Sequence, residues 1–151
     1  MESLITILQA DLEMILQLAL ACLLGGMVGL EREYSKKTAG LKTYILVSLG
    51  ATVFAIISQS AYDMFLGDTS FDPSRMASQV IVGIGFLGAG AIIKRGDEIH
   101  GVTTAAGIWI AAAIGLAVGT GLYFLAIATA LIALIVLTLV RKIEFSIKRK
   151  T

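Results

Sequence analysis

Five apolar stretches divide this sequence, and short polar segments separate them. Each stretch is close to the roughly 20 residues that an α-helix needs to cross the hydrocarbon core of a bilayer. With 57% hydrophobic residues, 15% charged residues and a mean hydropathy of +0.88, the chain carries more apolar surface than a soluble domain of 151 residues can bury. The sequence therefore predicts an all-α, polytopic membrane protein with five transmembrane helices. The expected spans are 12–30, 42–62, 77–93, 102–118 and 121–140.

The basic residues fall on one side of the predicted membrane. Eleven of the twelve Lys and Arg residues lie in the connection after the first span, the connection after the third span and the C-terminal tail, and Arg75 is the exception. Cytoplasmic loops carry such an excess of Lys and Arg. We therefore expect the N-terminus outside and the C-terminus in the cytoplasm. Residues 1–140 then form one five-helix transmembrane domain, and residues 141–151 form a basic cytoplasmic tail at the bilayer surface.

The third apolar stretch contains Gly83, Gly85 and Gly88 in the G-x-G-x-x-G spacing of a dinucleotide-binding loop. Such a loop needs a strand before it, a helix of some length after it and an acid about 20 residues later. Here the following helix would be too short, and positions 103–108 hold no acid. The sequence therefore predicts no cofactor. Together with Gly90, these glycines predict close helix packing or, as the alternative, a broken third helix that exposes backbone carbonyls to a cavity.

Small residues recur at every fourth position in two other spans. Because lipid tails give no hydrophobic push between helices, association in a membrane relies on close backbone approach at such residues. We expect these stripes to be packing faces, and faces left over within one chain to favour a homo-oligomer or another membrane protein as partner. The stripes are Ala21, Gly25 and Gly29 in the first span and Gly107, Ala111, Gly115 and Gly119 in the fourth.

Glu31, Arg32 and Glu33 directly follow the first span. One interpretation is a charged cap that holds the helix end at the membrane surface. The other is functional, because Glu31 could turn into the bundle, and an acid at that depth is a functional candidate. On a helix Glu31 and Glu33 point in different directions, so Arg32 can pair with only one of them at a time.

Residues 94–101 predict a compact cytoplasmic turn between the third and fourth spans. We expect Thr103 or Thr104 to cap the fourth helix, whose N-terminal end could then hold an anion at the cytoplasmic mouth. We expect His100 to be solvated. Trp109 lies well inside the fourth span, so we expect it to pack against protein or to line a cavity.

The middle of each predicted span lacks Asp, Glu, Lys, Arg and His. A relay for a proton or a divalent ion through one chain is therefore poorly supported, since Mg²⁺ usually binds through carboxylates and water. No pair of nucleophile and base and no cluster of metal ligands appears, so we expect no enzyme. Cys22 is expected to be a small residue facing lipid or the core. The basic tail is too short to favour nucleic-acid binding.

Ordered blocks of residues between about positions 15 and 125 resemble the MgtC/SapB family of bacterial membrane proteins. The blocks are Gly29-Leu30-Glu31-Arg32-Glu33, Ala39-Gly40-Leu41-Lys42-Thr43, Leu49-Gly50-Ala51, Arg75 with Gln79-Val80, Gly83-Ile84-Gly85-Phe86-Leu87-Gly88-Ala89-Gly90, and Gly101-Val102-Thr103-Thr104-Ala105-Ala106 through Trp109. The resemblance adds Gly40, Lys42, Thr43, Arg75, Gln79 and Phe86 to the candidate functional residues.

The resemblance implies a five-span protein of the bacterial inner membrane that is associated with adaptation to low Mg²⁺ and, in pathogens, with survival in host phagocytes. The family was long described as Mg²⁺ transporters, and some members act instead on partners that include the F-type ATP synthase. The better-known virulence members carry a soluble domain after the fifth span. We therefore expect this chain to be a short form of the family.

Two hypotheses for the function follow. In the first, the chain is a regulatory protein that binds membrane proteins or itself, with Glu31, Arg32, Glu33 and the turn at 94–100 as its cytoplasmic recognition surface. In the second, it transports Mg²⁺ or another small solute along a path between helices, and the glycine-rich third span supplies backbone carbonyls to that path.

Overall fold

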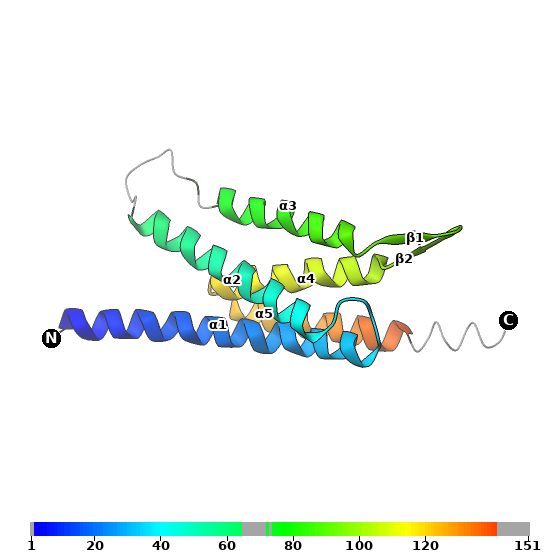
Figure 1. The fold of residues 1–151 in the computed structure, drawn as a ribbon. Helices are drawn as coiled ribbons and strands as arrows, with labels where there is room; N and C mark the ends of the chain where they lie inside the picture. Colours follow the sequence, from blue (N-terminus) through cyan, green and yellow to red (C-terminus); the bar gives the residue numbers. More distant parts are fainter. Residues whose placement is uncertain (1, 65–71, 73, 142–151) are drawn as a thin grey trace.

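The computed structural model describes residues 2–64, 72 and 74–141 (Figure 1). This part of the chain forms five α-helices, a two-stranded hairpin and a short π-helix. The bounds are α1 (Glu2–Tyr34), α2 (Leu41–Met64), α3 (Ser74–Gly90), β1 (Ile93–Arg95), β2 (Glu98–His100), α4 (Val102–Gly119), α5 (Tyr123–Ile135) and the π-helix η1 (Val136–Val140). Each of the five helices overlaps one of the five predicted spans, but the third span was predicted to reach residue 93, whereas α3 ends at Gly90 and Ile93 begins β1. The predicted basic tail lies almost wholly outside the described residues.

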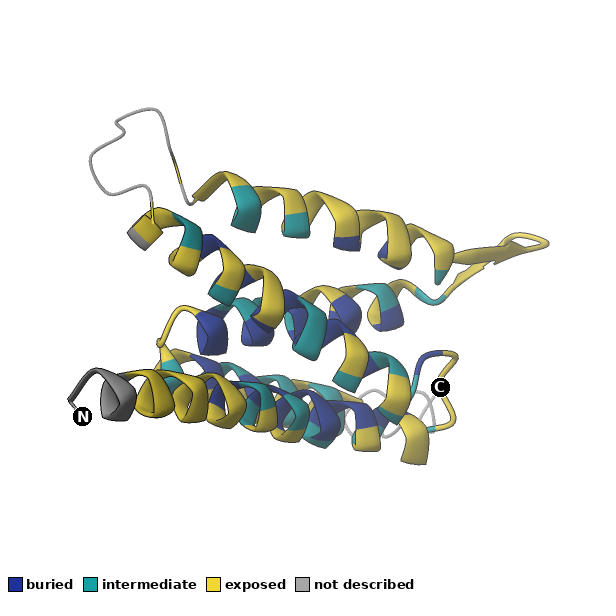
Figure 2. Ribbon diagram, turned by 60° about the vertical axis from the view of Figure 1, so that its left-hand side comes forward, coloured by how far each residue is buried: buried dark blue, intermediate teal, exposed yellow. Residues whose placement is uncertain are grey.

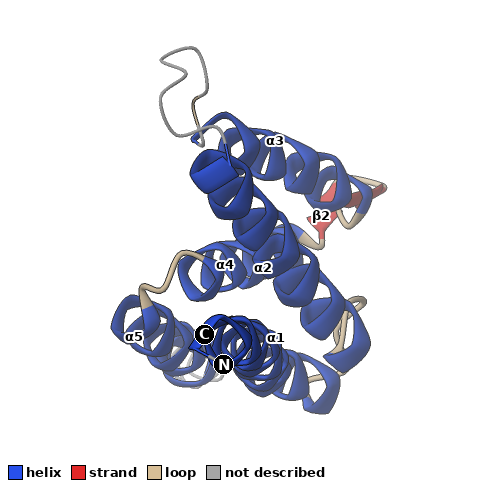
Figure 3. Cartoon of the chain, turned by 90° about the vertical axis from the view of Figure 1, so that its left-hand side faces the viewer, coloured by secondary structure: helices blue, strands red, loops and turns tan. Residues whose placement is uncertain are grey.

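Successive helices run in opposite directions, so the α1–α2 loop, the hairpin and the end of η1 lie at the same end of the molecule, on the right in Figure 1. Helix α4 packs against α1, α2, α3 and α5, and α3 lies at the outside of the bundle (Figures 1 and 3). Burial follows this arrangement. Most residues of α4 are buried, whereas α3 buries only Ile84 and Gly88 (Figure 2).

The contacts of α2 with α1 and with α4 depend on glycine. A Cβ atom added at Gly25 would lie 2.7 Å from the Cβ of Ser48, and one added at Gly119 would lie 2.7 Å from the backbone oxygen of Thr52. These separations are too short for real atoms, so only glycine permits this packing. We call this contact the glycine seam. It comprises Gly25, Gly29, Gly107, Gly115 and Gly119 with the α2 residues that they meet.

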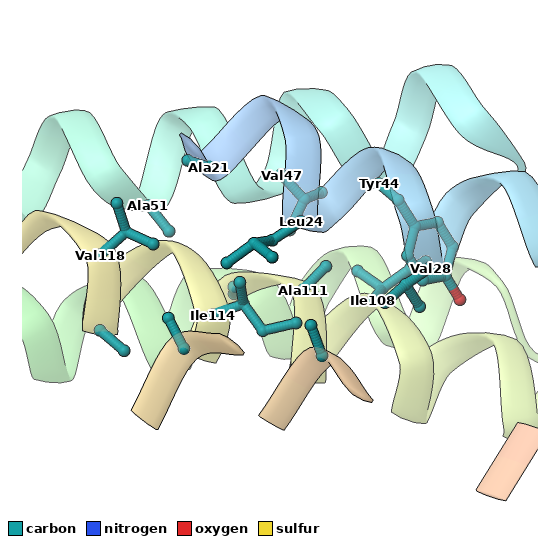
Figure 4. Packing of buried hydrophobic residues seen from close by; sticks show 14 of the residues in the cluster. Ala21, Leu24, Val28, Tyr44, Val47, Ala51, Ile108, Ala111, Ile114 and Val118 are labelled. Carbon is teal, nitrogen blue, oxygen red and sulfur yellow. The ribbon is translucent and has the colours of Figure 1, made fainter. Parts of the chain in front are cut away.

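The glycine seam confirms that the small-residue stripes are packing faces, and both stripes pack on α2 of the same chain. Apolar side chains such as Leu24, Val28 and Ile114 fill the space beside the seam (Figure 4). In a bilayer this packing stabilises the fold chiefly through dispersion between closely fitted atoms, because lipid is as apolar as the helix surface.

Four helical segments of the described chain are long and apolar enough to cross a membrane: Ile7–Tyr34, Leu41–Tyr62, Val102–Gly119 and Tyr123–Val140. The remaining helix, α3, is third in chain order; it has 17 residues and is shorter than these segments. The described chain is thus that of a multi-pass membrane protein. The presence of a third helix is confirmed, while its crossing of the membrane stays a prediction.

The connection between α3 and α4 is a β-hairpin, in which Ile93 pairs with His100 and Arg95 pairs with Glu98. This differs from an all-α chain by one short antiparallel pair. Gly101 follows with a φ of 90° and forms the N-cap of α4, and no side chain caps that helix. The prediction that Thr103 or Thr104 caps α4 is therefore wrong, because the N-cap lies two residues before Thr103, at Gly101, whose left-handed conformation favours glycine.

Candidate functional site

Arg32 is the charged side chain buried most deeply at the hairpin end of the bundle, with 2% of its surface exposed. Its guanidinium donates to the carboxylate of Glu31, which is itself 11% exposed. Glu31 also accepts a hydrogen bond of 2.6 Å from Ser35 and lies 3.7 Å from the guanidinium of Arg141, just after η1. The contact of Glu31 with Arg141 therefore joins the end of α1 to the end of η1.

Arg32 was predicted to pair with only one of its two acidic neighbours at a time, and it pairs with Glu31 rather than Glu33. Arg32, rather than Glu31, is the residue that lies deepest in the bundle. A cation is favoured there because the backbone carbonyls at the C-terminal end of α1 carry partial negative charge.

Glu33 holds the start of α2. Its Oε2 atom accepts a hydrogen bond of 3.0 Å from the backbone N–H of Leu41, the first residue of α2. A Cβ atom at Gly40 would collide with the same carboxylate. Glycine at position 40 thus leaves room for a charged cap on α2, where a carboxylate is favoured by the helix dipole. Both residues have a structural role at this corner.

Tyr44 fixes α2 to α4, and the sequence analysis missed it. Its side chain is fully buried, and its hydroxyl donates a hydrogen bond of 3.3 Å to the backbone oxygen of Thr104. Its ring lies against Gly107, where an added Cβ would be 3.2 Å from the ring edge. A buried tyrosine needs a partner for its hydroxyl. The signal available in the sequence was a tyrosine next to polar residues at the start of a span.

A second site is an open groove between α2 and α3, with a volume of about 720 Å³. It brings together four of the predicted residues, Lys42, Thr43, Gln79 and Gly83. The remaining lining is apolar and comes from both helices. It comprises Leu46, Val47, Gly50, Ala51 and Phe54 of α2 and Met76, Val80, Ile84 and Leu87 of α3. We call this site the α2–α3 groove.

The glycines of α3 mostly face open space. Helix α3 is continuous, so the alternative of a broken third helix is wrong. An added Cβ would meet nothing within 4 Å at Gly83, Gly85 or Gly90. Only Gly88 packs within the described chain, where an added Cβ would lie 3.6 Å from the Cβ of Ala105 on α4. Close packing is therefore confirmed at one of the four glycines.

Other predicted residues lie outside both sites. Trp109 is 48% exposed on α4, so the prediction that it packs against protein or lines a cavity is wrong for the single chain. Phe86 is 81% exposed on α3. Arg75 is exposed in the first turn of α3, and Thr103 lines a smaller pocket of about 330 Å³ between α1, α4 and the end of α5. His100 is exposed beside Glu98, as predicted.

The sequence model of the protein family described as the MgtC family matches residues 18–146 of the chain. The chain belongs to the MgtC family. In this MgtC-family chain, the residue blocks that carry the resemblance lie in two parts of the structure. Glu31, Arg32, Glu33 and Gly40 hold the helix ends together, whereas Lys42 and its neighbours open on the α2–α3 groove.

Curated relatives carry the same family resemblance. "Putative magnesium transporter YhiD" of Escherichia coli strain K12 is 41% identical over 140 residues, which cover 91% of this chain and 65% of that protein. Protein MgtC of Brucella abortus strain 2308 is 42% identical over 137 residues, covering 88% and 55%. Protein SapB of Bacillus subtilis strain 168 is 42% identical over 128 residues, covering 83% and 55%.

The chain therefore spans between about half and two thirds of the length of these MgtC-family relatives. No solved structure matches the chain.

Proposed function

We propose that this chain is a protein of the bacterial cytoplasmic membrane that serves magnesium homeostasis by binding membrane proteins or a second copy of itself. In this proposal it neither conducts the ion nor catalyses a reaction. Membership of the MgtC family and the name of the Escherichia coli relative support the link to magnesium.

The glycine seam is the observation that carries this proposal. An ion path through one chain needs space and polar groups between helices. Along the seam the backbones of α1, α2 and α4 are in contact, and a single added methyl group at Gly25 or Gly119 would collide with α2. The buried hydroxyl of Thr52 is already bonded to the backbone oxygens of Ser48 and Gly115. In this proposal the centre of the bundle is a structural support rather than a conduit.

Large apolar side chains on the outside provide the surface for partners. Phe86 on α3, Trp109 on α4 and Phe124 on α5 are all about half exposed or more. Aromatic residues of this kind are enriched in the contacts between proteins. The recognition surface that we propose is therefore these faces together with the exposed hairpin, while Glu31 and Arg32 serve to hold the helix ends.

The proposed topology has five spans, with the N-terminus outside and the C-terminus in the cytoplasm. It is supported by the alternating direction of the helices, which places Lys42, Lys94 and Arg141 at one end of the bundle (Figure 1). Single cysteines in a Cys22→Ser background test it. Lys36→Cys should react with a membrane-impermeant thiol reagent only after the cells are opened, and Asp72→Cys should react in intact cells.

Transport of Mg²⁺ or another small solute is the second candidate. The observation that favours it is the α2–α3 groove, which a second copy of the chain could close into a path. The groove is lined mainly by apolar side chains, and Lys42 would repel a cation at one end. This candidate therefore requires polar groups from the second copy.

Two measurements on the same protein separate the candidates. The first is Mg²⁺ uptake into liposomes that contain the purified chain, compared with empty liposomes. The second is growth at low Mg²⁺ of bacteria that lack their own relative, rescued by the wild type or by Phe86→Ala and Trp109→Ala. Rescue without uptake, lost in a folded surface variant, supports partner binding. Uptake above empty liposomes would overturn it in favour of transport.

A further inference from the structure

The α2–α3 groove is lined by one glycine from each helix, Gly50 and Gly83. An added Cβ at Gly50 on α2 or at Gly83 on α3 would meet nothing within 4 Å. At the glycine seam the same residue type brings backbones into contact, so α2 is tightly packed on one side and open on the other. The space of about 720 Å³ lies within the roughly 300–1,000 Å³ that holds a small molecule.

The groove has one charged end. Lys42 and Thr43 lie in the first turn of α2, at the hairpin end of the bundle, and the lining between them and Met76 is apolar apart from Gln79. Lys42 is exposed and forms no ion pair with a carboxylate in the described part of the chain. The nearby Glu33 carboxylate is bound to the N–H of Leu41. The ammonium group of Lys42 thus lies at one end of the apolar α2–α3 groove.

This combination matches one class of ligand. A phospholipid has a long apolar chain that ends in a phosphate, and basic pockets between helices on the cytoplasmic side bind anionic headgroups. The N-terminus of α2 is already capped by the Glu33 carboxylate, so Lys42 is the group in the groove that offers a positive charge. A helix from a second copy fits the volume poorly, because an α-helix about 10 Å wide would exceed it within about two turns.

We propose that the α2–α3 groove binds an acyl chain of an anionic phospholipid, whose phosphate is held by Lys42. The inference goes beyond the proposed function and does not rest on it. A lipid in this position would seal the open side of α2 and would support α3, which otherwise meets the bundle mainly through α4.

The test uses the purified full chain in detergent and counts bound lipids by native mass spectrometry, with phosphatidylglycerol as the anionic probe and phosphatidylcholine as the zwitterionic probe. The wild type should prefer phosphatidylglycerol. Lys42→Gln should lower phosphatidylglycerol binding about fivefold, as expected for one basic residue near a lipid phosphate. It should lower phosphatidylcholine binding by less, because the choline ammonium of that lipid offsets the charge of its phosphate. Lys37→Gln, a matched change in the α1–α2 loop, should have no such effect.

The apolar half of the proposal has its own pair of variants. Gly83→Leu should fill the groove and lower binding of both lipids, whereas Gly85→Leu, two residues further along α3 and outside the groove, should lower neither. Gly50→Leu fills the groove from the opposite wall and replaces Gly83→Leu if that variant does not fold.

Three results would overturn the proposal. Equal losses in Lys42→Gln and Lys37→Gln would reduce the effect to surface charge. Unchanged lipid binding in a folded groove-filling variant would place the lipid elsewhere. A groove-filling variant that changes the size of the protein on gel filtration while keeping its lipid would make the groove a contact between copies.

Discussion

Glycine has opposite effects on the two sides of α2. Towards α1 and α4, glycine removes side chains so that backbones touch, and any added atom would collide. Towards α3, Gly50 and Gly83 remove side chains and nothing takes their place. The difference teaches that a glycine-rich helix in a membrane is not by itself a sign of packing. What matters is whether the neighbouring helix approaches.

The largest effect should come from placing the same side chain on the two sides. Gly115→Leu would drive a side chain into the backbone of α2 at Ser48, so we expect a loss of at least about 3 kcal/mol and no stable protein. Gly83→Leu should fold normally. Yield and thermal unfolding in detergent measure both, and equal stability of the two variants would contradict the comparison.

A smaller effect is expected at the ion pair of Glu31 and Arg32, close to the end of α1. Arg32→Ala removes the partner of the nearly buried Glu31 and should cost about 3 kcal/mol of unfolding free energy. Arg141→Ala removes a half-exposed partner of the same carboxylate and should cost at most about 1 kcal/mol. Unfolding in detergent checks the ranking. Equal costs would mean that the burial of Arg32 is unimportant.

Neighbouring residues on α2 sharpen the comparison further, because Tyr44 faces the glycine seam and Thr43 faces the α2–α3 groove. Tyr44→Phe loses the hydrogen bond to the backbone oxygen of Thr104 and should cost about 1 kcal/mol. Thr43→Val should change the unfolding free energy by much less. The reverse order in thermal unfolding would show that the groove side carries more of the stability.

The smallest effect is expected at Ser48, within the glycine seam. Its hydroxyl oxygen is buried and has no hydrogen-bond partner among the described residues. Ser48→Ala should therefore leave the unfolding free energy unchanged or raise it by up to about 1 kcal/mol, since an unsatisfied buried polar group is unfavourable. A clear loss of stability would reveal a partner for this hydroxyl, such as a bound water.

The sequence predicted the helices well, because long apolar stretches bounded by charges are a strong signal. It also predicted the small-residue stripes, since a spacing of four marks one face of a helix. It did not predict that both stripes pack on α2, because spacing identifies a face and not its partner. The roles of Glu33 and Gly40 depend on a loop conformation, and their spacing alone gives no sign of the contact.

Trp109 was misplaced for a physical reason. In a soluble protein a tryptophan amid apolar residues indicates the core, but in a membrane protein the outer surface is as apolar as the interior. Composition alone cannot separate a lipid-facing residue from a buried one there. Tyr44 was missed for the opposite reason, because only the position of Thr104 on another helix shows where its hydroxyl is bound.

The hydroxyl of Thr52 bears on how the protein is made. Its single proton is shared between two backbone oxygens, that of Ser48 on its own helix at 2.9 Å and that of Gly115, 63 residues further along the chain, at 2.8 Å. At a synthesis rate of about 5–20 residues per second, Thr52 is made roughly 3 to 13 seconds before Gly115. Before α4 is present, the hydroxyl can donate to the backbone oxygen of Ser48 within α2. An α2 helix that enters the membrane before α4 therefore exposes no unpaired hydroxyl of Thr52 to lipid.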